Sequence, residues 1–345
     1  MQLIKPDINI NFIGKKNIAF AVSVIMIAIS IASLVIHRGP RYGIDFAGGT
    51  LIQIKFVKQV NLDDIKSGLA SIELGKSSVQ QFGEVKENEY LIRTNKSVMT
   101  NKEFSEDIIN AVQSSTGTDV EIRRTEMVGP QVGKDLREKA LFAMFYALLF
   151  ITIYISGRFE LKWMLSAVMA AALMGAIAFF KLFNVSIPVL IAIALAVTLV
   201  LFWFFKLKFA MGAIVALIHD VTITMGIFSM CNKEVTLPII AALLTIIGYS
   251  LNDTIIVFDR IRENRRKYHK NSMDIIINKS INETLSRTIL TSFTTLVVVV
   301  ALLVLGGGII HDFAFAMTIG ILIGTYSSVY VASPILLAWQ GHGKK

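Results

Sequence analysis

Long apolar stretches separated by short polar ones make up most of the chain. The first covers about 18–36, and from residue 139 onward they follow closely at about 140–155, 164–183, 187–205, 210–230, 237–258, 289–305 and 313–339. Each is near the roughly 20 residues with which an α-helix crosses a ~30 Å hydrocarbon core. The pattern therefore predicts a polytopic α-helical membrane protein with eight spans.

Between the first two apolar stretches the pattern becomes that of a small soluble domain. Thr50–Phe56 alternates apolar and polar residues with the period of two that is typical of a half-buried strand. Helices are predicted from Asn61 to about Ile72 and from Asn101 to Ser114, and further strands at Ser78–Phe82, Tyr90–Thr94 and Val120–Met127. The order β-α-β-β-α-β predicts one α+β domain of ferredoxin-like fold, which contains no catalytic constellation and so favours a binding or lever module.

Composition supports a membrane location. Hydrophobic residues make up 54% of the chain and charged residues 17%, which is more apolar than a water-soluble core requires. The net charge of +9 comes from Lys and Arg at the ends of the apolar stretches, and this distribution argues against nucleic-acid binding. If the amino terminus is cytoplasmic, the inner loops hold most of these residues, so the positive-inside rule places the soluble domain in the periplasm of a bacterium.

These assignments divide the chain into consecutive segments. They are a cytoplasmic amino-terminal segment (1–17), a first transmembrane helix (18–36), the periplasmic domain (37–138), further transmembrane helices (139–258), a basic cytoplasmic loop (259–287), the last two transmembrane helices (288–339) and a cytoplasmic tail (340–345). The basic loop is compatible with a short amphipathic helix on the membrane face or with a solvated loop. Residues 159–167 resemble 205–213, which indicates a duplicated helical hairpin at about 162–205.

Several classes of active site are missing from the sequence. We find no Gly-rich phosphate loop, no His/Cys ligand cluster and no nucleophile elbow, and the single Cys231 has no partner for a disulfide. The chain is therefore not expected to be an enzyme or to hold a metal or an organic cofactor. ATP is also disfavoured as its energy source.

Ionisable residues within the apolar stretches are few. Asp253, next to Asn252, lies in an apolar helix, where a carboxylate costs about 3 kcal/mol on insertion scales. Arg287 precedes the next span at a similar depth and could pair with Asp253, beside a hydroxyl stripe that includes Thr288 and Thr291. A proton pathway needs a carboxylate whose pKa can shift through the working range, a cation that changes partners and a path that holds water. These residues supply all three, so the sequence predicts a proton pathway here. The alternative is a static ion pair that fixes helix register.

Two further features are candidate sites. His219 and Asp220 lie in the middle of a span and form either a secondary polar site or a structural hydrogen-bonded pair. The glycine-rich segment after the first span is either a hinge or docking point between membrane and soluble domain or a plain linker turn. Its candidate residues are Tyr42, Gly43, Asp45, Phe46, Gly48 and Gly49.

Several of these strings resemble a known family. The segments 42–50, 212–221, 247–254 and 258–264, together with Arg287-Thr288 and 330–334, resemble the SecF branch of the SecD/SecF protein translocase family, which is related to resistance-nodulation-division transporters. The resemblance implies a bacterial inner-membrane subunit that pairs with SecD. It also implies that the subunit uses the proton-motive force, with protons as the coupling ion, to assist preprotein export through SecYEG after the SecA step, with YidC/YajC as further partners. Asp253 and Arg287 match the family's proton-pathway residues, and the second Asp would lie in SecD.

The chain departs from the family pattern in one respect. The family has six spans, whereas here the extra hairpin at about 162–205 separates Arg158-Phe159-Glu160 from Gly212. An even number of added spans leaves the orientation of Asp253 and Arg287 unchanged, but it affects packing against SecD. Two other functions are alternatives: a small-molecule efflux transporter, which the single soluble domain disfavours, and a scaffold that transports nothing.

Overall fold

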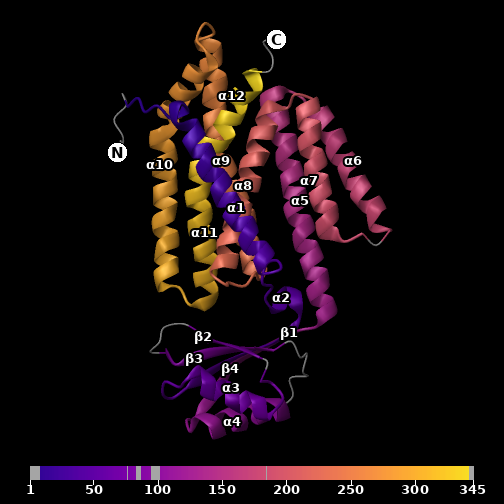
Figure 1. The fold of residues 1–345 in the computed structure, drawn as a ribbon, viewed down its shortest axis with the longest axis vertical. Helices are drawn as coiled ribbons and strands as arrows, with labels where there is room; N and C mark the ends of the chain where they lie inside the picture. The colour runs from indigo at the N-terminus through magenta and orange to yellow at the C-terminus, as the bar shows by residue number, and fades with distance from the viewer. Residues whose placement is uncertain (1–7, 76, 83–86, 95–101, 184, 342–345) are drawn as a thin grey trace.

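A bundle of long helices stands on a small sheet domain in the computed structural model of the chain (Figure 1). The structure describes residues 8–75, 77–82, 87–94, 102–183 and 185–341. Parts of the predicted amino-terminal segment (1–7) and tail (342–345) lie outside the described residues. The chain passes between bundle and sheet domain twice, once after α1 and once on entering α5.

Most of the described chain is helical. The long helices are α1 (Lys16–Ile36), α5 (Pro130–Glu160), α6 (Trp163–Lys181), α7 (Ile187–Phe204), α8 (Lys208–Met230), α9 (Leu237–Lys267), α10 (Met273–Leu305) and α11 (Gly308–Ser327). A 3-10 turn (Ile13–Lys15) precedes α1, and a π-helical turn (Ser328–Ala332) joins α11 to α12 (Ser333–Gly341). Proline occupies the first turn of α5, α7 and α9, where its missing N–H costs no helical hydrogen bond.

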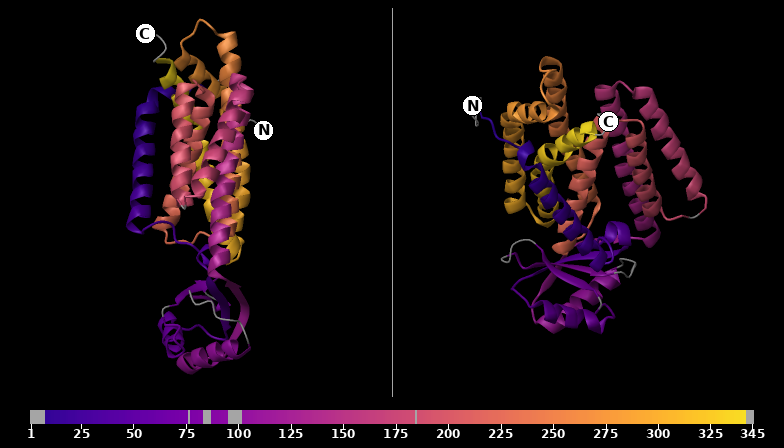
Figure 2. Two further views of the ribbon diagram at one scale, coloured as in Figure 1. Left: turned by 90° about the vertical axis from the view of Figure 1, so that its right-hand side faces the viewer. Right: turned by 45° about the horizontal axis from the view of Figure 1, so that its top comes forward.

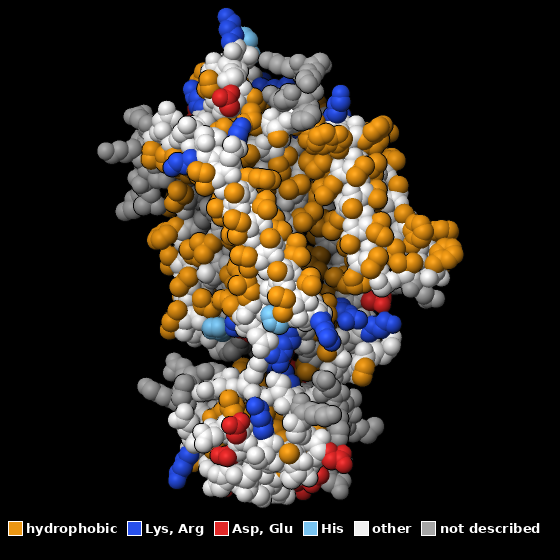
Figure 3. All heavy atoms as spheres, viewed as in Figure 1, with side chains coloured by type: hydrophobic (Ala, Val, Ile, Leu, Met, Phe, Trp, Pro, Cys, Tyr) orange, Lys and Arg blue, Asp and Glu red, His pale blue; other side chains and the backbone are white. Residues whose placement is uncertain are grey.

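In the described part of the chain, seven helical stretches are long and apolar enough to cross a membrane. The last of them, Ile310–Trp339, includes α11, the π-helical turn and most of α12. The apolar stretch in α7, Pro188–Phe204, is shorter, so the eighth predicted span stays a prediction. Apolar side chains cover the visible face of the bundle and Lys and Arg gather at its two ends (Figure 3), as expected for a multi-pass membrane protein.

The sheet domain has the predicted order of strands and helices. Its strands are β1 (Gly49–Phe56), β2 (Ser78–Phe82), β3 (Glu89–Thr94) and β4 (Val120–Val128), paired antiparallel in the order β2-β3-β1-β4. Helices α3 (Leu62–Ser71) and α4 (Lys102–Thr116) cover the side of the sheet that faces away from the bundle (Figure 1). Alternate residues of β1 point into this core, where Ile52 and Ile54 are fully buried against Ile65 and Ile108.

Residues 259–287, predicted as a basic cytoplasmic loop that is either a short amphipathic helix or solvated, are mostly helical in the structure. Helix α9 continues to Lys267 and α10 begins at Met273, so a helical hairpin with a short turn forms the end of the bundle opposite the sheet domain (Figure 2). The apolar residues of this region, such as Ile261 of α9 and Ile277 of α10, are fully buried and belong to one apolar cluster. Asn264 also joins the two helices, because its Nδ2 donates to Ser280 Oγ over 3.0 Å.

The predicted extra hairpin is formed by α6 and α7, which lie at one side of the bundle (Figure 1). Its contact with α5 is an apolar cluster in which Phe145 and Leu149 meet Leu173 and Ala194. The hairpin is therefore attached to the bundle through apolar packing.

Candidate functional site

The buried carboxylate of Asp253 is the centre of the predicted proton pathway. Its side chain, on α9, is 1% exposed. Oδ2 accepts a hydrogen bond from Ser292 Oγ on α10 over 3.3 Å, and Ser292 Oγ lies 2.7 Å from Thr325 Oγ1 on α11. Oδ1 has no hydrogen-bond partner among the described residues. An incompletely bonded carboxylate inside a bundle is costly, and it is suited to a change in protonation.

The predicted pair between Asp253 and Arg287 does not form in this structure. Arg287 is exposed on α10, and no ion pair joins it to Asp253 in the described part of the chain. Arg287 and Ser292 are five positions apart, which places them about 140° apart around the helix, so they face different directions. Similar depth in the membrane was therefore not sufficient for contact.

The other predicted pathway residues divide between the core and the surface. Thr288 is buried one helical turn before Ser292, and its Oγ1 has no described partner. Thr291 is half-buried and donates to the carbonyl of Arg287 over 3.0 Å. Asn252 is exposed on α9. The structure thus brings Asp253 and Ser292 together in the core and leaves Asn252 and Arg287 on the adjoining outer faces of α9 and α10.

His219 and Asp220, on α8, are the centre of a second buried cluster. His219 Nδ1 lies 2.8 Å from Asp220 Oδ1, and the two side chains are 2% and 0% exposed. Oδ2 of Asp220 accepts hydrogen bonds from Ser250 over 2.6 Å and from Ser327 over 2.7 Å. On the other side, His219 Nε2 lies 3.2 Å from Ser23 Oγ on α1. The predicted secondary polar site is therefore a network between four helices, and its serines were not anticipated.

Close packing of α9 and α11 brings the two clusters near each other. Ser250 lies one turn before Asp253 on α9, and Ser327 follows Thr325 on α11. A Cβ added at Gly324 would lie 2.9 Å from the Cβ of Ser250, so glycine is needed for this approach. The α9–α11 pair therefore supplies Ser250 and Ser327 to Asp220, and α11 reaches Asp253 only through the contact of Thr325 with Ser292 of α10.

The glycine-rich segment after α1 docks the sheet domain against the bundle. Gly43 N–H donates to the carbonyl of Val235 over 2.9 Å, and Val235 N–H donates to that of Arg41 over 2.7 Å. Asp45 Oδ2 accepts from Leu237 N–H over 2.9 Å at the start of α9, where a carboxylate is favoured by the helix dipole. These contacts support the docking prediction over the plain linker turn.

The remaining residues of the predicted docking segment fill the space around these bonds. Phe46 is 3% exposed in an apolar cluster with residues of α9. Gly48 has φ +76°, and a Cβ there would lie 2.8 Å from Pro130 Cα, so a side chain is excluded. Gly49 begins β1. Arg137 lies 5.2 Å from the Tyr42 ring; burial raises the pKa of Tyr42, and Arg137 lowers it by a smaller amount.

An ion pair that the sequence did not reveal strengthens the docking. Glu234, in the link between α8 and α9, is 8% exposed and lies 2.6 Å from Arg93 of β3 and 3.5 Å from Arg41. Arg93 also donates to Gln80 Oε1 of β2 over 3.1 Å. Glu234 and Arg93 are far apart in sequence, and neither has a local pattern that marks it as a partner of the other.

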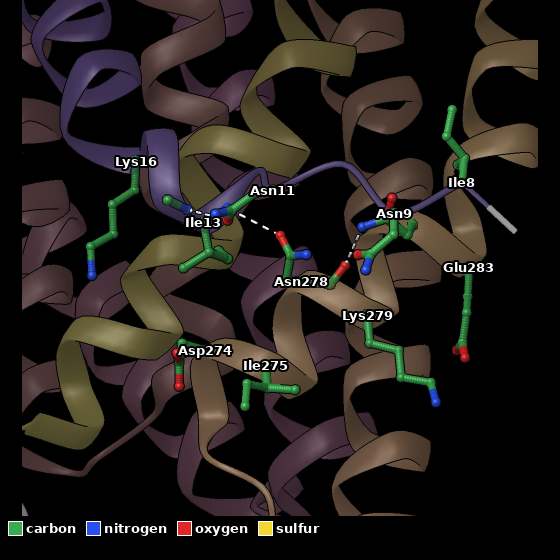
Figure 4. A pocket seen from close by; sticks show the side chains of 12 residues that line it. Ile8, Asn9, Asn11, Ile13, Lys16, Asp274, Ile275, Asn278, Lys279 and Glu283 are labelled. Carbon is green, nitrogen blue, oxygen red and sulfur yellow. Dashed lines mark hydrogen bonds between the residues drawn. The ribbon is translucent and has the colours of Figure 1, made fainter.

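A cavity of about 870 Å³ lies at the opposite end of the bundle, between the amino-terminal segment and α10 (Figure 4). Asn278 Oδ1 accepts from Phe12 N–H over 2.8 Å, and Asn282 Oδ1 accepts from Ile10 N–H over 2.8 Å. Both amide groups also donate to the carbonyl of Ile10. The described part of the amino-terminal segment is thus held to α10 through its backbone.

Comparisons with known proteins give the family. The model described as "Protein export membrane protein SecD/SecF, C-terminal" matches residues 108–195 and 181–342, and "SecD/SecF GG Motif" matches 33–60. The two parts of the first match overlap at 181–195, within the α6–α7 hairpin.

Relatives cover nearly the whole chain. Protein translocase subunit SecF of Magnetococcus marinus is 42% identical over 98% of this chain and 94% of its own length, and that of Vibrio alginolyticus is 41% identical over 97% and 91%. The crystal structure of SecDF, a translocon-associated membrane protein from Thermus thermophilus, matches with a TM-score of 0.71 at 31% identity, covering 98% of this chain and 40% of the solved one. The chain therefore belongs to the SecF family of protein translocase subunits.

Proposed function

We propose that this chain uses the proton-motive force, together with a SecD partner, to assist preproteins through a SecYEG channel after the SecA step. Asp253 is the observation that carries this proposal. It is a carboxylate buried in an apolar helix, and no described cation is paired with it. A static ion pair, the alternative reading, would place Arg287 against it. An uncompensated buried charge is costly, so a change in the surroundings of Asp253 can drive a proton on or off.

The surface next to Asp253 supports SecD as the partner. Asn252 and Arg287 are exposed on neighbouring helices around the buried carboxylate, where polar groups would otherwise meet lipid. The solved relative is a SecDF chain, of which this chain covers 40%. We assign these faces of α9 and α10 to contact with SecD. SecD would supply the second carboxylate of the pathway, and this carboxylate would be a partner for the Arg287 side chain. SecYEG, YidC/YajC, membrane lipid and the preprotein are further proposed contacts.

The proposed arrangement in the inner membrane has eight spans, a cytoplasmic amino terminus and a periplasmic sheet domain. With 18 residues, α7 is about 27 Å long at 1.5 Å per residue, which is near the thickness of a thin bilayer. The two overlapping family matches support the α6–α7 hairpin as a duplicate. The sheet order β2-β3-β1-β4, with both helices on one face, supports a ferredoxin-like fold for the periplasmic domain.

The experiment is a secretion assay in cells that depend on this chain and its SecD partner. Preprotein export is measured with and without an uncoupler for the wild type, Asp253→Asn and Arg287→Ala. Thr318→Ala is the matched control, because Thr318 lies on α11, outside the faces assigned to SecD, and its hydroxyl donates to the carbonyl of Ala314 in its own helix. We expect both test variants to lose the uncoupler-sensitive part of export and the control to keep it. Undiminished export in both test variants would refute the proposal and favour a scaffold.

A further inference from the structure

The donor and the acceptor of each hydrogen bond in the chain from Ala19 to His219 can be assigned. Tyr326 has a single hydroxyl proton, and it donates that proton to the carbonyl of Ala19 over 2.7 Å, since a carbonyl only accepts. Tyr326 also lies 3.1 Å from Ser23 Oγ. Because its proton is already used, Tyr326 accepts the proton of Ser23 in this contact.

The direction of the Ser23 hydroxyl then decides the state of the imidazole. Ser23 Oγ also lies 3.2 Å from His219 Nε2, and its one proton points to Tyr326, so Nε2 must carry the hydrogen of this bond. On the other side of the ring, Nδ1 and Asp220 Oδ1 are 2.8 Å apart, which requires one more proton between them. The His219–Asp220 pair therefore holds two protons and has no net charge.

Burial favours the same result. A neutral imidazole beside an ionised carboxylate would leave one net negative charge in a core where both side chains are almost completely buried. No Lys or Arg contacts the pair among the described residues. Other titratable groups around the cluster are Tyr326, whose ring centroid lies 6.1 Å from that of His219, Tyr330, whose ring centroid lies 5.2 Å from that of Tyr326, and Asp253, one turn from Ser250. None of them is a cation that could offset the charge.

We propose that His219 and Asp220 form a second proton-binding site in the membrane domain, occupied by one exchangeable proton and joined to α1 through Ser23 and to α9 and α11 through Ser250 and Ser327. Loss of this proton leaves a net negative charge at the pair. It also leaves Nε2 as an acceptor, so Ser23 must turn its hydroxyl away from Tyr326. Proton release thus changes the contact between α1 and α11.

The variant Asp220→Asn separates a proton-binding role of the pair from a purely structural one. In Asp220→Asn, the amide oxygen can accept from Ser250 and Ser327, and the amide NH₂ can donate to His219 Nδ1. Every hydrogen bond of the cluster is then kept, with His219 neutral and Nε2 protonated. Only the exchangeable proton is removed. A residue that merely held the helices together would tolerate this change.

The first measurement is ¹⁵N NMR of the ring nitrogens of His219 in the full chain in lipid bilayers, assigned with His219→Gln. We expect Nε2 to be protonated at neutral pH in the wild type and in Tyr330→Phe, a matched control that keeps Tyr326. In Asp220→Asn we expect Nε2 to stay protonated and Nδ1 to become a bare acceptor. A bare Nε2 in the wild type would overturn the inference.

The second measurement is preprotein export. That the proton of the His219–Asp220 pair takes part in export rests on the proposed function. We expect Asp220→Asn to fold with wild-type thermal stability and to lose the uncoupler-sensitive part of export. If Asp253→Asn loses that part and Asp220→Asn keeps it in full, the proposed function stands and the second site is refuted. If Asp253→Asn keeps it, the proposed function itself fails, and the NMR result alone then decides whether the pair holds a proton.

Discussion

The ion pairs of Glu234 offer a quantitative test of how the sheet domain is held. Glu234→Gln keeps the shape of the side chain but removes its charge, leaving Arg93 and Arg41 without a counter-ion. Removing one partner of a buried pair costs about 3–5 kcal/mol. Arg93 is 19% exposed and still bonds to Gln80, so we expect the lower end, about 3 kcal/mol, in the free energy of undocking.

Hydrogen exchange measures this free energy directly. The amides of Gly43 and Val235 bond across the contact, so they exchange when the domain undocks. A loss of about 3 kcal/mol corresponds to exchange faster by roughly a hundredfold at these two amides, with no change at β1 amides in the sheet core. Glu121→Gln is the control, because its pair with Arg123 is exposed on the sheet domain. Unchanged exchange at Gly43 and Val235 in Glu234→Gln would refute the reasoning.

Two further predictions concern packing and the amino-terminal segment. Gly324→Ala places a Cβ 2.9 Å from that of Ser250, so we expect the free energy of unfolding, measured by thermal denaturation, to fall by about 1–3 kcal/mol. Gly248→Ala is the control, because a Cβ at Gly248 meets open space and should not destabilise the protein. A wild-type melting temperature for Gly324→Ala would contradict the close packing of α9 and α11. Asn278→Ala combined with Asn282→Ala should release residues 8–13 to protease while the bundle stays folded, and unchanged cleavage would show that the two amides do not hold the segment.

The sheet domain was predictable because its determinants are local. The alternation of apolar and polar residues in β1 and the helix start at Asn61 depend only on consecutive residues. The structure has both elements within a residue or two of the predicted bounds. The docking segment was also visible, since glycines at 43, 48 and 49 mark a backbone that approaches other backbone.

What the sequence could not supply depends on contacts between distant segments. Residues 259–287 form a helical hairpin whose apolar side chains, such as Ile261 and Ile277, are buried in one cluster, and the run of basic residues in the sequence obscures this packing. Depth in the membrane placed Arg287 near Asp253, but rotation about α10 turns it outward. The Glu234–Arg93 pair and the serines around Asp220 join helices and strands whose proximity exists only in the folded chain.

The most direct test of the central claim is translocation into inverted membrane vesicles that contain this chain with its SecD partner. Preprotein uptake is driven by SecA and ATP, and is measured with and without an imposed proton-motive force. For Asp253→Asn we predict that the ATP-driven part equals the wild type and that the increment from the proton-motive force disappears. An Asp253→Asn variant that shows the full increment would contradict the account.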